Sequence, residues 1–254
     1  MQINDRVFVI TGGVSGIGRA NVEYFHERGA RVAIFDMNAE AGEALAKELG
    51  DKAVFAEVNV TDEASVQAGI AKAMEAFGAI HVCLNFAGIA HAAKTLGKEG
   101  PFPLDQFNKV IQINLVGTFN VLRLAAEQMA NNEPVEGERG VIINTASVAA
   151  YEGQIGQAAY SASKGGIVGM TLPIARDLAQ LDIRVNTIAP GLIYTPLFEA
   201  LGEKVVDALS QQVLNPQRLG RPEEIAQMAQ SIVENAYVNG ETIRVDGGIR
   251  MQPR

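Results

Sequence analysis

The sequence predicts an α/β protein in which helices cover both faces of a mostly parallel, doubly wound sheet of about seven strands. Short apolar runs alternate with longer amphipathic stretches along the whole chain, which is the pattern of repeated β-α-β units. The apolar runs show no polar alternation, as expected of strands that are buried on both faces. A length of 254 residues, without repeats or a linker, favours a single domain over residues 1–254.

The expected strands are the short apolar segments. The first, Val-Phe-Val-Ile, contains only apolar residues and precedes a glycine-rich turn. The strands cover residues 7–10, 31–35, 53–58, 80–85, 140–144, 183–188 and 241–245. Because each is followed by a helical stretch, neighbouring strands are expected to run in the same direction.

The expected helices are the amphipathic stretches between these strands, and Asp62 is the N-cap candidate of the third. They cover residues 16–28, 39–49, 62–77, part of 104–129, 157–180 and 222–233. Residues 97–103 and 131–139 are polar or rich in glycine and proline, which predicts surface loops. Residues 192–214 have no role in the sheet and are expected to form a lid over a ligand site.

Composition disfavours several classes of partner. The chain has 29 acidic and 21 basic residues, a net charge of −8 and no basic run, so nucleic acid and anionic membranes are not expected partners. No apolar stretch is long enough to span a bilayer, and the first strand begins too early to leave room for a signal peptide. The single cysteine, Cys83, lies in an apolar segment, which predicts an inert core thiol and a reducing, cytoplasmic location. His26, His81 and His91 lack metal-ligand spacing, so no metal site is expected.

A glycine-rich turn links the first strand to the first helix. It reads Thr-Gly-Gly-Val-Ser-Gly-Ile-Gly over residues 11–18. Glycines let the backbone approach a pyrophosphate closely, and the helix N-terminus adds free N–H groups and a partial positive charge. An ordinary glycine-rich turn is the alternative, but the strand–turn–helix context favours a dinucleotide site.

Asp36 ends the second strand, where an acidic side chain accepts hydrogen bonds from the ribose diol of adenosine. Its charge would repel a 2′-phosphate, and the glycine-rich turn contains no Lys or Arg to receive one. The sequence therefore predicts NAD rather than NADP as the cofactor. A solvent-exposed aspartate in a turn is the alternative interpretation.

The ends of the other strands point to the same region. Asn59–Val60, Asn85–Phe86–Ala87–Gly88, Ser147 and Pro190–Gly191 directly follow expected strands. In an open parallel sheet, ligands bind beyond the carboxyl ends of the strands. These segments are therefore expected to meet at one edge of the sheet, together with the glycine-rich turn.

Tyr160 and Lys164 occupy positions i and i+4 of an expected helix and so share one face. An ammonium beside a phenol favours the phenolate and lowers the phenol pKa from its usual value of about 10. The pair predicts a general acid/base, with the Ser147 hydroxyl nearby to hold a substrate oxygen. Asn114 lies inside another long helix, where asparagine is a mediocre helix former; a polar position on an exposed face is the alternative.

With these motifs assembled, the chain resembles the short-chain dehydrogenase/reductase family, whose members have a Rossmann-type sheet. The motifs are Thr11-Gly-x-x-x-Gly16-x-Gly18, Asn85-x-Ala87-Gly88, Asn114, Ser147, Tyr160-x-x-x-Lys164 and Pro190–Gly191. The resemblance implies that Tyr160 transfers a proton and that Ser147 binds the substrate oxygen. It also implies that Lys164 lowers the Tyr160 pKa and binds the nicotinamide ribose, and that Asn114 holds a water molecule.

The resemblance implies a larger set of residues along the dinucleotide, with Thr195 near the carboxamide. The set is Gly12, Ser15, Gly16, Ile17, Gly18, Asp36, Asn59, Val60, Asn85, Phe86, Ala87, Gly88, Tyr160, Lys164, Pro190, Gly191, Ile193 and Thr195. Gln154 is an implied substrate contact. Two positions depart from the family pattern, because Phe86 stands where asparagine is common and Asn59 where aspartate is common.

Residues 140–179 and 246–253 are similar to a subgroup of the family that acts on 3-hydroxyacyl-CoA and on hydroxysteroids. The similarity implies an NAD-dependent enzyme of fatty acid metabolism that interconverts (S)-3-hydroxyacyl-CoA and 3-oxoacyl-CoA. Lys94, Lys98 and Lys204 are then the nearest candidates to bind the CoA phosphates, although they could equally be solvated surface residues. The family also implies a homotetramer.

Other functions stay open at this point. A hydroxysteroid or another short-chain alcohol could be the substrate. A 3-oxoacyl-carrier-protein reductase is disfavoured by Asp36, because such enzymes usually use NADPH. A function from another class, a non-catalytic nucleotide-binding scaffold, is disfavoured by the complete set of Ser147, Tyr160, Lys164 and Asn114.

Overall fold

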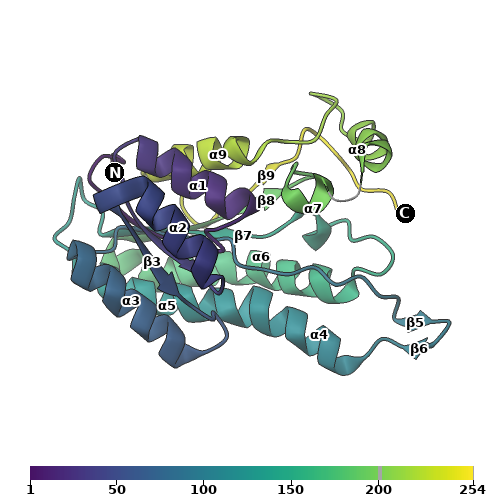
Figure 1. The fold of residues 1–254 in the computed structure, drawn as a ribbon, viewed down its shortest axis with the longest axis horizontal. Helices are drawn as coiled ribbons and strands as arrows, with labels where there is room; N and C mark the ends of the chain where they lie inside the picture. Colours follow the sequence, from purple (N-terminus) through teal and green to yellow (C-terminus); the bar gives the residue numbers. More distant parts are fainter. Residues whose placement is uncertain (200–201, 254) are drawn as a thin grey trace.

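A seven-stranded parallel sheet forms the centre of the computed structural model, which describes residues 1–199 and 202–253 (Figure 1). The strands are β1 (Val7–Thr11), β2 (Arg31–Asp36), β3 (Ala53–Glu57), β4 (Val82–Asn85), β7 (Gly140–Thr145), β8 (Ile183–Pro190) and β9 (Thr242–Val245). Their order is β3-β2-β1-β4-β7-β8-β9, and every pairing is parallel. The predicted doubly wound α/β fold is confirmed.

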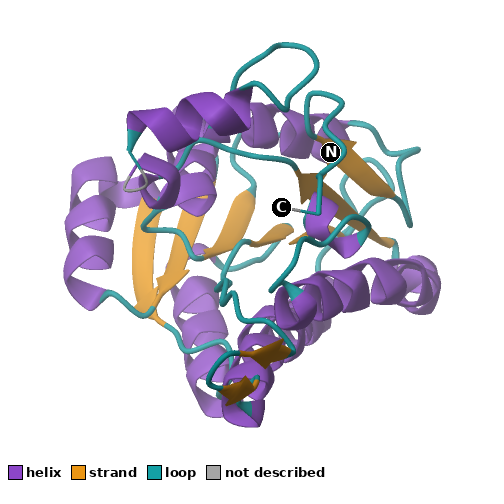
Figure 2. Cartoon of the chain, turned by 90° about the vertical axis from the view of Figure 1, so that its right-hand side faces the viewer, coloured by secondary structure: helices purple, strands orange, loops and turns teal. Residues whose placement is uncertain are grey.

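Helices cover both faces of the sheet (Figure 2). One face carries α1 (Gly16–Glu27), α2 (Ala39–Leu49) and α9 (Pro222–Glu234), and the other carries α3 (Glu63–Phe77), α5 (Gly117–Met129) and α6 (Ala158–Leu178). Each layer has its own apolar core, with Phe25 and Ile225 in the first and Ile70 and Val121 in the second. The strands are apolar on both sides because each side packs against helices.

The order of the strands reverses between β1 and β4. Strands β2 and β3 lie on one side of β1, whereas the chain continues on the other side from β4 onward. Such a reversal opens a crevice at the carboxyl ends of the strands, which is where α/β proteins of this type bind ligands. The topology therefore places the glycine-rich turn after β1 and the segment after β4 on opposite sides of one crevice.

Local signals in the sequence place several elements correctly. Asp62 caps α3, since its side chain accepts a hydrogen bond of 3.0 Å from the backbone N–H of Ala64. Gly78 ends the same helix with φ of 76°, a left-handed conformation that favours glycine. Cys83 is fully buried in β4, and burial raises the pKa of its thiol to about 12, so the thiol stays neutral.

Other segments differ from the expectation. The expected loop at 97–103 contains an antiparallel hairpin, β5 (Leu96–Gly97) and β6 (Gly100–Pro101), which projects from the end of the molecule opposite the N-terminus (Figure 1). The long helix expected within 104–129 consists of α4 (Leu104–Ile111), a π-helical turn (Gln112–Val116) and α5.

The lid expected at 192–214 contains α7 (Pro196–Glu199) and α8 (Glu203–Ser210), while its residues 200–201 lie outside the described residues. No helix within residues 1–199 or 202–253 combines the length and the apolar character needed to cross a bilayer.

Candidate active site

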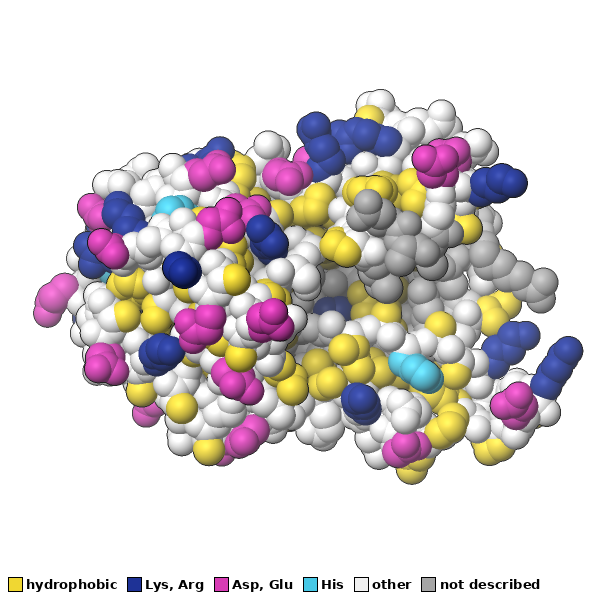
Figure 3. All heavy atoms as spheres, viewed as in Figure 1, with side chains coloured by type: hydrophobic (Ala, Val, Ile, Leu, Met, Phe, Trp, Pro, Cys, Tyr) yellow, Lys and Arg dark blue, Asp and Glu magenta, His cyan; other side chains and the backbone are white. Residues whose placement is uncertain are grey.

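Two adjoining cavities lie at the carboxyl ends of the strands, and the surface of the molecule is hollowed near this region (Figure 3). The larger has a volume of about 850 Å³ and runs past the ends of β1, β2 and β3 toward α4. The smaller, of about 220 Å³, lies beside the ends of β7 and β8. Both are lined by Ile17, Phe86, Thr145 and Thr195, so one ligand could extend through both.

The glycine-rich turn brings backbone to the wall of the larger cavity. Gly12 has φ of +66°, and a Cβ atom there would lie 3.0 Å from the backbone nitrogen of Ala87. Gly16 also has a positive φ, of +50°, and a Cβ atom on Gly18 would collide with the carbonyl oxygen of Gly12. Each of the three positions therefore requires glycine for the close approach that the sequence predicted.

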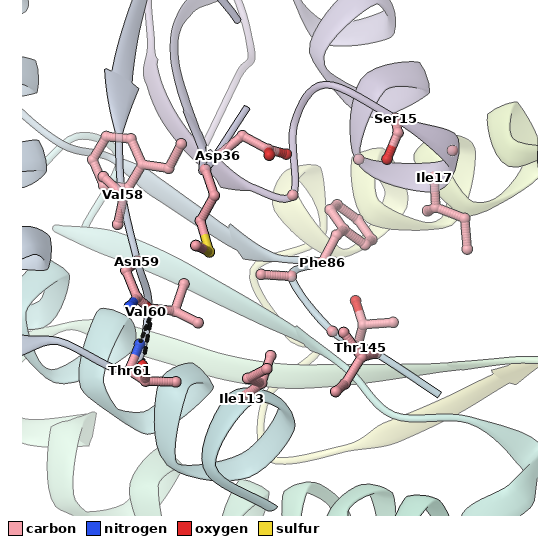
Figure 4. A pocket seen from close by; sticks show the side chains of 18 of the residues that line it. Ser15, Ile17, Asp36, Val58, Asn59, Val60, Thr61, Phe86, Ile113 and Thr145 are labelled. Atoms are coloured by element: carbon pink, nitrogen blue, oxygen red, sulfur yellow. Dashed lines mark hydrogen bonds between the residues drawn. The ribbon is translucent and has the colours of Figure 1, made fainter. Parts of the chain in front are cut away.

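Asp36, at the end of β2, also lines the larger cavity (Figure 4). Its carboxylate accepts hydrogen bonds from the backbone N–H groups of Val14, at 3.3 Å, and Asn38, at 3.1 Å. These contacts fix the carboxylate beside the glycine-rich turn. They leave it lone pairs for further hydrogen bonds, because an ionised carboxylate has about four acceptor sites.

Asn59 also lines the larger cavity, and its side-chain oxygen stabilises the turn that follows β3. The oxygen accepts hydrogen bonds from the backbone N–H of Thr61, at 3.1 Å, and from the Thr61 hydroxyl, at 2.8 Å. An aspartate would make the same contacts. The departure from the family pattern therefore keeps the turn and adds a side-chain NH₂ group to the cavity wall.

The segment after β4 is held by Thr11, whose hydroxyl oxygen accepts hydrogen bonds of 3.1 Å from the backbone N–H groups of Phe86 and Ala87. Asn85 lies behind this wall and not in the lining of either cavity. Its side-chain amide donates a 3.0 Å hydrogen bond to the Asn144 side-chain oxygen, so it links β4 to β7 inside the sheet. The structure thus gives Asn85 a position under the expected cofactor site rather than in it.

The smaller cavity brings together Ser147, Tyr160 and Lys164. Ser147 begins a short 3₁₀ turn (Val148–Ala150), and its hydroxyl oxygen accepts a 3.1 Å hydrogen bond from the N–H of Ala149. Tyr160 lies in the first turn of α6 and Lys164 in the next, so both lie on one face of the helix. The Lys164 ammonium donates a 2.7 Å hydrogen bond to the Thr145 carbonyl oxygen and lies 5.7 Å from the centre of the Tyr160 ring.

The electrostatics of this pair differ from the expectation. Burial lowers the Lys164 pKa from 10.5 to about 8, which still leaves the ammonium form dominant at pH 7. Burial raises the Tyr160 pKa, and the hydroxyl of Ser147 opposes this rise. The phenol is thus less acidic than the sequence predicted, because the loss of water around Tyr160 outweighs the hydrogen bond with Ser147, while the Lys164 ammonium donates to Thr145.

Asn114 is fully buried, so its alternative interpretation as an exposed polar position is wrong. It lies in the π-helical turn between α4 and α5. Its side-chain amide accepts a 2.8 Å hydrogen bond from the Ile89 N–H, and donates to the Ile89 carbonyl at 2.9 Å and the Ser163 hydroxyl at 3.0 Å. A Cβ atom on Gly88 would lie 3.2 Å from the Asn114 oxygen and 3.7 Å from the Lys164 nitrogen.

Gln154 and the three candidate phosphate-binding lysines do not line either cavity. The Gln154 side-chain amide donates a 3.0 Å hydrogen bond to the Gln252 carbonyl oxygen, in the C-terminal segment. Lys94, Lys98 and Lys204 are exposed.

Every other residue expected along the dinucleotide, apart from Asn85, lines one cavity or the other. Residues that the sequence did not single out also line them, chiefly Met37, Ile89, Lys109, Gln112, Ile113, Thr145 and Phe198. Thr145 and Ile89 could have been found, because they lie beside strand ends. Lys109 and Phe198 come from helices, where no local pattern indicates a cavity.

Comparisons with known proteins agree with this geometry. The family model described as enoyl-(acyl carrier protein) reductase matches residues 12–250. The 3-hydroxyacyl-CoA dehydrogenase type-2 of Homo sapiens is 57% identical, with 99% of this chain and 98% of the relative aligned. Its counterpart of the same name in Drosophila melanogaster is 53% identical, with 99% and 100% aligned.

A crystal structure of 3-hydroxyacyl-CoA dehydrogenase type-2 from Mycobacterium avium superposes with a TM-score of 0.94. It is 42% identical in sequence and covers 99% of this chain and 98% of its own. The likeness therefore extends over nearly the whole length of both chains. Sequence, fold and site agree that the chain belongs to the short-chain dehydrogenase/reductase family of nicotinamide-dependent oxidoreductases.

Proposed function

We propose that this protein is an NAD-dependent dehydrogenase that interconverts (S)-3-hydroxyacyl-CoA and 3-oxoacyl-CoA. The observation that carries the proposal is the meeting of Ser147, Tyr160 and Lys164 in one cavity that adjoins a glycine-lined cleft. The choice of substrate is supported by relatives named 3-hydroxyacyl-CoA dehydrogenase type-2, which align with nearly the whole chain.

The residues present fit a dinucleotide. The larger cavity has a volume of about 850 Å³ and combines glycine backbone with the free N–H groups of α1. Asp36 would accept hydrogen bonds from an adenosine ribose diol and would repel a 2′-phosphate, which favours NAD. Lys109 of α4 also lines the cleft. When bound, the nicotinamide supplies or accepts the hydride.

The protein side of the reaction follows from the smaller cavity. Ser147 would hydrogen-bond the substrate oxygen and orient it toward Tyr160. In alcohol oxidation the Tyr160 phenolate would remove the hydroxyl proton, and in ketone reduction the Tyr160 hydroxyl would return it. Lys164 would stabilise the phenolate and hold the nicotinamide ribose. Asn114 would hold a water molecule that connects Lys164 to solvent.

Further parts of the proposal concern organisation. We propose one NAD-binding domain over residues 1–254 with a lid at 192–214, and a cytoplasmic role in fatty acid metabolism. Self-association as a homotetramer is supported by exposed apolar side chains in the π-helical turn, α5 and α6, namely Val116, Phe119 and Leu172.

A substrate panel tests the function. Purified protein with NADH is offered acetoacetyl-CoA, an acetoacetyl-carrier protein and a steroid ketone at equal concentration, and the decrease in NADH absorbance is followed. We expect acetoacetyl-CoA to give the highest kcat/KM, NADPH to be a poor replacement for NADH, and Tyr160→Phe to abolish most of the turnover. A preference for the steroid or the carrier protein would contradict the substrate. Tight NADH binding without any turnover would favour a scaffold.

A further inference from the structure

A cluster of charged side chains lies outside both cavities, centred on Arg244 in β9. The guanidinium donates to both oxygens of Glu152, at 2.8 and 3.1 Å, and to an Asp246 oxygen at 2.7 Å. It also donates to the Ile249 carbonyl oxygen at 3.0 Å and lies 5.4 Å from the centre of the Tyr151 ring. The side chains of Arg244 and Glu152 are each 22% exposed, so this two-pronged ion pair is partly buried.

Glu152 connects the cluster to the loop that begins at Ser147. The backbone N–H of Glu152 donates at 3.0 Å to the carbonyl oxygen of Val148, the first residue of the 3₁₀ turn that follows Ser147. The carboxylate of Glu152 therefore fixes the far end of this turn. The position of the Ser147 hydroxyl relative to Tyr160 depends on that turn.

The same loop is bound to the C-terminal segment at successive residues. The Met251 N–H donates to the Glu152 carboxylate at 3.3 Å, and the Ile155 N–H donates to the Pro253 carbonyl oxygen at 3.0 Å. The hydrogen bond from Gln154 to Gln252 lies between these two. Residues 152–155 and 251–253 thus lie side by side as one layer.

The residues after Arg244 hold both ends of the expected lid. At its start, the Gly191 N–H donates to the Val245 carbonyl oxygen at 2.9 Å. At its end, the N–H groups of Leu214 and Asn215 donate to the Gly247 carbonyl oxygen at 3.2 and 3.0 Å. The Ser147 loop, the C-terminal segment and the lid therefore all converge on the short stretch that Arg244 begins.

We propose that Arg244 and Glu152 are positioning residues: their ion pair holds the Ser147 loop and the lid in one arrangement and thereby sets the affinity for the acyl substrate. The inference rests on the proposed function. Neither residue lines the dinucleotide cleft, so cofactor affinity should be independent of the pair. Asp246 still faces Arg244 at 2.7 Å, and Arg250 still faces Glu152 at 3.3 Å, when the pair is broken. The Ser147 loop nevertheless loses its two-pronged link to β9, which should loosen the loop.

The kinetic test uses Glu152→Gln, Arg244→Lys and the double variant. We expect each single change to raise the KM for acetoacetyl-CoA about tenfold, with kcat within about twofold and the Kd for NADH unchanged. The double variant should be little worse than either single one, because each single change already breaks the two-pronged contact between Arg244 and Glu152. Arg139→Lys is the matched control: Arg139 pairs with Asp182 at 3.7 Å, at the opposite end of β7 from Ser147.

Hydrogen exchange provides a readout that needs no substrate. In both single variants the amides of Ile155, Leu214, Asn215 and Met251 should exchange about tenfold faster, and in the control they should not. Unchanged exchange at these amides would overturn the inference, as would a loss of NADH affinity equal to the rise in KM. If the wild type reduces no acyl-CoA, the proposed substrate is wrong, and KM is then measured with whichever ketone of the panel is reduced.

Discussion

The side-chain amide of Asn114 forms two hydrogen bonds with the backbone of Ile89, one to its N–H at 2.8 Å and one to its carbonyl oxygen at 2.9 Å. Ile89 follows the segment after β4 and lines both cavities. A third hydrogen bond joins Asn114 to Ser163 in α6. The hydroxyl of Ser163 donates in turn to the Tyr160 carbonyl oxygen at 2.7 Å. One buried amide thus connects the cofactor wall to the helix that carries Tyr160.

Replacing Asn114 with alanine should therefore destabilise the protein as well as the site. The change leaves the N–H and carbonyl of Ile89 without their side-chain partner, and a buried unsatisfied polar group costs about 1–3 kcal/mol. We expect the free energy of unfolding, measured by urea denaturation, to fall by about 2–4 kcal/mol. The control Asn108→Ala, on the exposed face of α4, should change it by less than about 0.5 kcal/mol. Equal effects at the two positions would contradict this account.

The sequence predicted those site residues whose positions follow from spacing along a helix or from the carboxyl end of a strand. Tyr160 and Lys164 share a helix face at any tertiary arrangement, and Asp36 and Ser147 follow strands whose carboxyl ends must meet. The contribution of Asn114 could not be predicted in the same way. Its burial depends on a π-helical turn and on packing against Ile89, neither of which leaves a local signal.

Two further properties required the tertiary structure. The direction of the Tyr160 pKa shift depends on how much water surrounds the phenol, and spacing along the chain carries no information about that. Gln154 was expected at the substrate by resemblance, yet its side-chain amide contacts Gln252, 98 residues further along the chain. Contacts between segments so distant in sequence are not visible in any local pattern.

Tyr160→Phe removes the hydroxyl that we propose to transfer the proton. General acid–base groups contribute about 10²–10⁴-fold to rates, so kcat should fall by about that factor while the Kd for NADH changes less than about twofold. The remaining activity should also lose its rise with pH in the alcohol-oxidation direction, since that rise reflects formation of the phenolate. Steady-state rates over a pH series and NADH fluorescence titration measure both effects. Tyr237→Phe is the control, because Tyr237 is 99% exposed.

Asp36→Asn tests the choice of cofactor. The substitution keeps the size of the side chain but removes its charge and one of the two acceptor oxygens used by Val14 and Asn38. We expect the Kd for NADH to rise about tenfold and the Kd for NADPH to fall, as repulsion of the 2′-phosphate disappears. Glu57→Gln removes an exposed charge from the paired position on β3 and should leave the ratio of the two constants unchanged. If Asp36→Asn also left the ratio of the Kd values for NADH and NADPH unchanged, Asp36 would not be the residue that selects NAD.

His81 should contribute to acid sensitivity. Burial lowers its pKa from 6.5 to about 4, and its Nδ1 accepts a 3.1 Å hydrogen bond from the Val7 N–H, which requires the neutral ring. Between these two pKa values the unfolded state binds more protons, so stability is lost as the pH falls from 6.5 toward 4. His81→Gln keeps an acceptor but cannot titrate, and its denaturation midpoint should vary less with pH across this window. The exposed His91→Gln should retain the pH dependence of the wild type.

Lys164→Met should separate stability from activity. The Lys164 side chain is almost completely buried, and its pKa is lowered from 10.5 to about 8. Below pH 8 the folded state must therefore hold an ammonium that would be better hydrated in the unfolded chain. As the pH rises from about 8 to 10.5 the folded state releases its proton first, so this unfavourable contribution is progressively relieved.

We therefore expect Lys164→Met to be more stable than the wild type at pH 7, by about 2 kcal/mol once the lost hydrogen bond to Thr145 is included. The difference should shrink as the pH rises from 8 to 10.5, and turnover should be lost at every pH. Thermal denaturation across this range measures the effect, with Lys72→Met as the control, because Lys72 is an exposed residue of α3 that lines neither cavity. A variant less stable than the wild type at pH 7 would show that the contact with Thr145 outweighs the cost of burying the charge. Burial would then not oppose stability at this site, and the lysine would be held there by packing as well as by its chemistry.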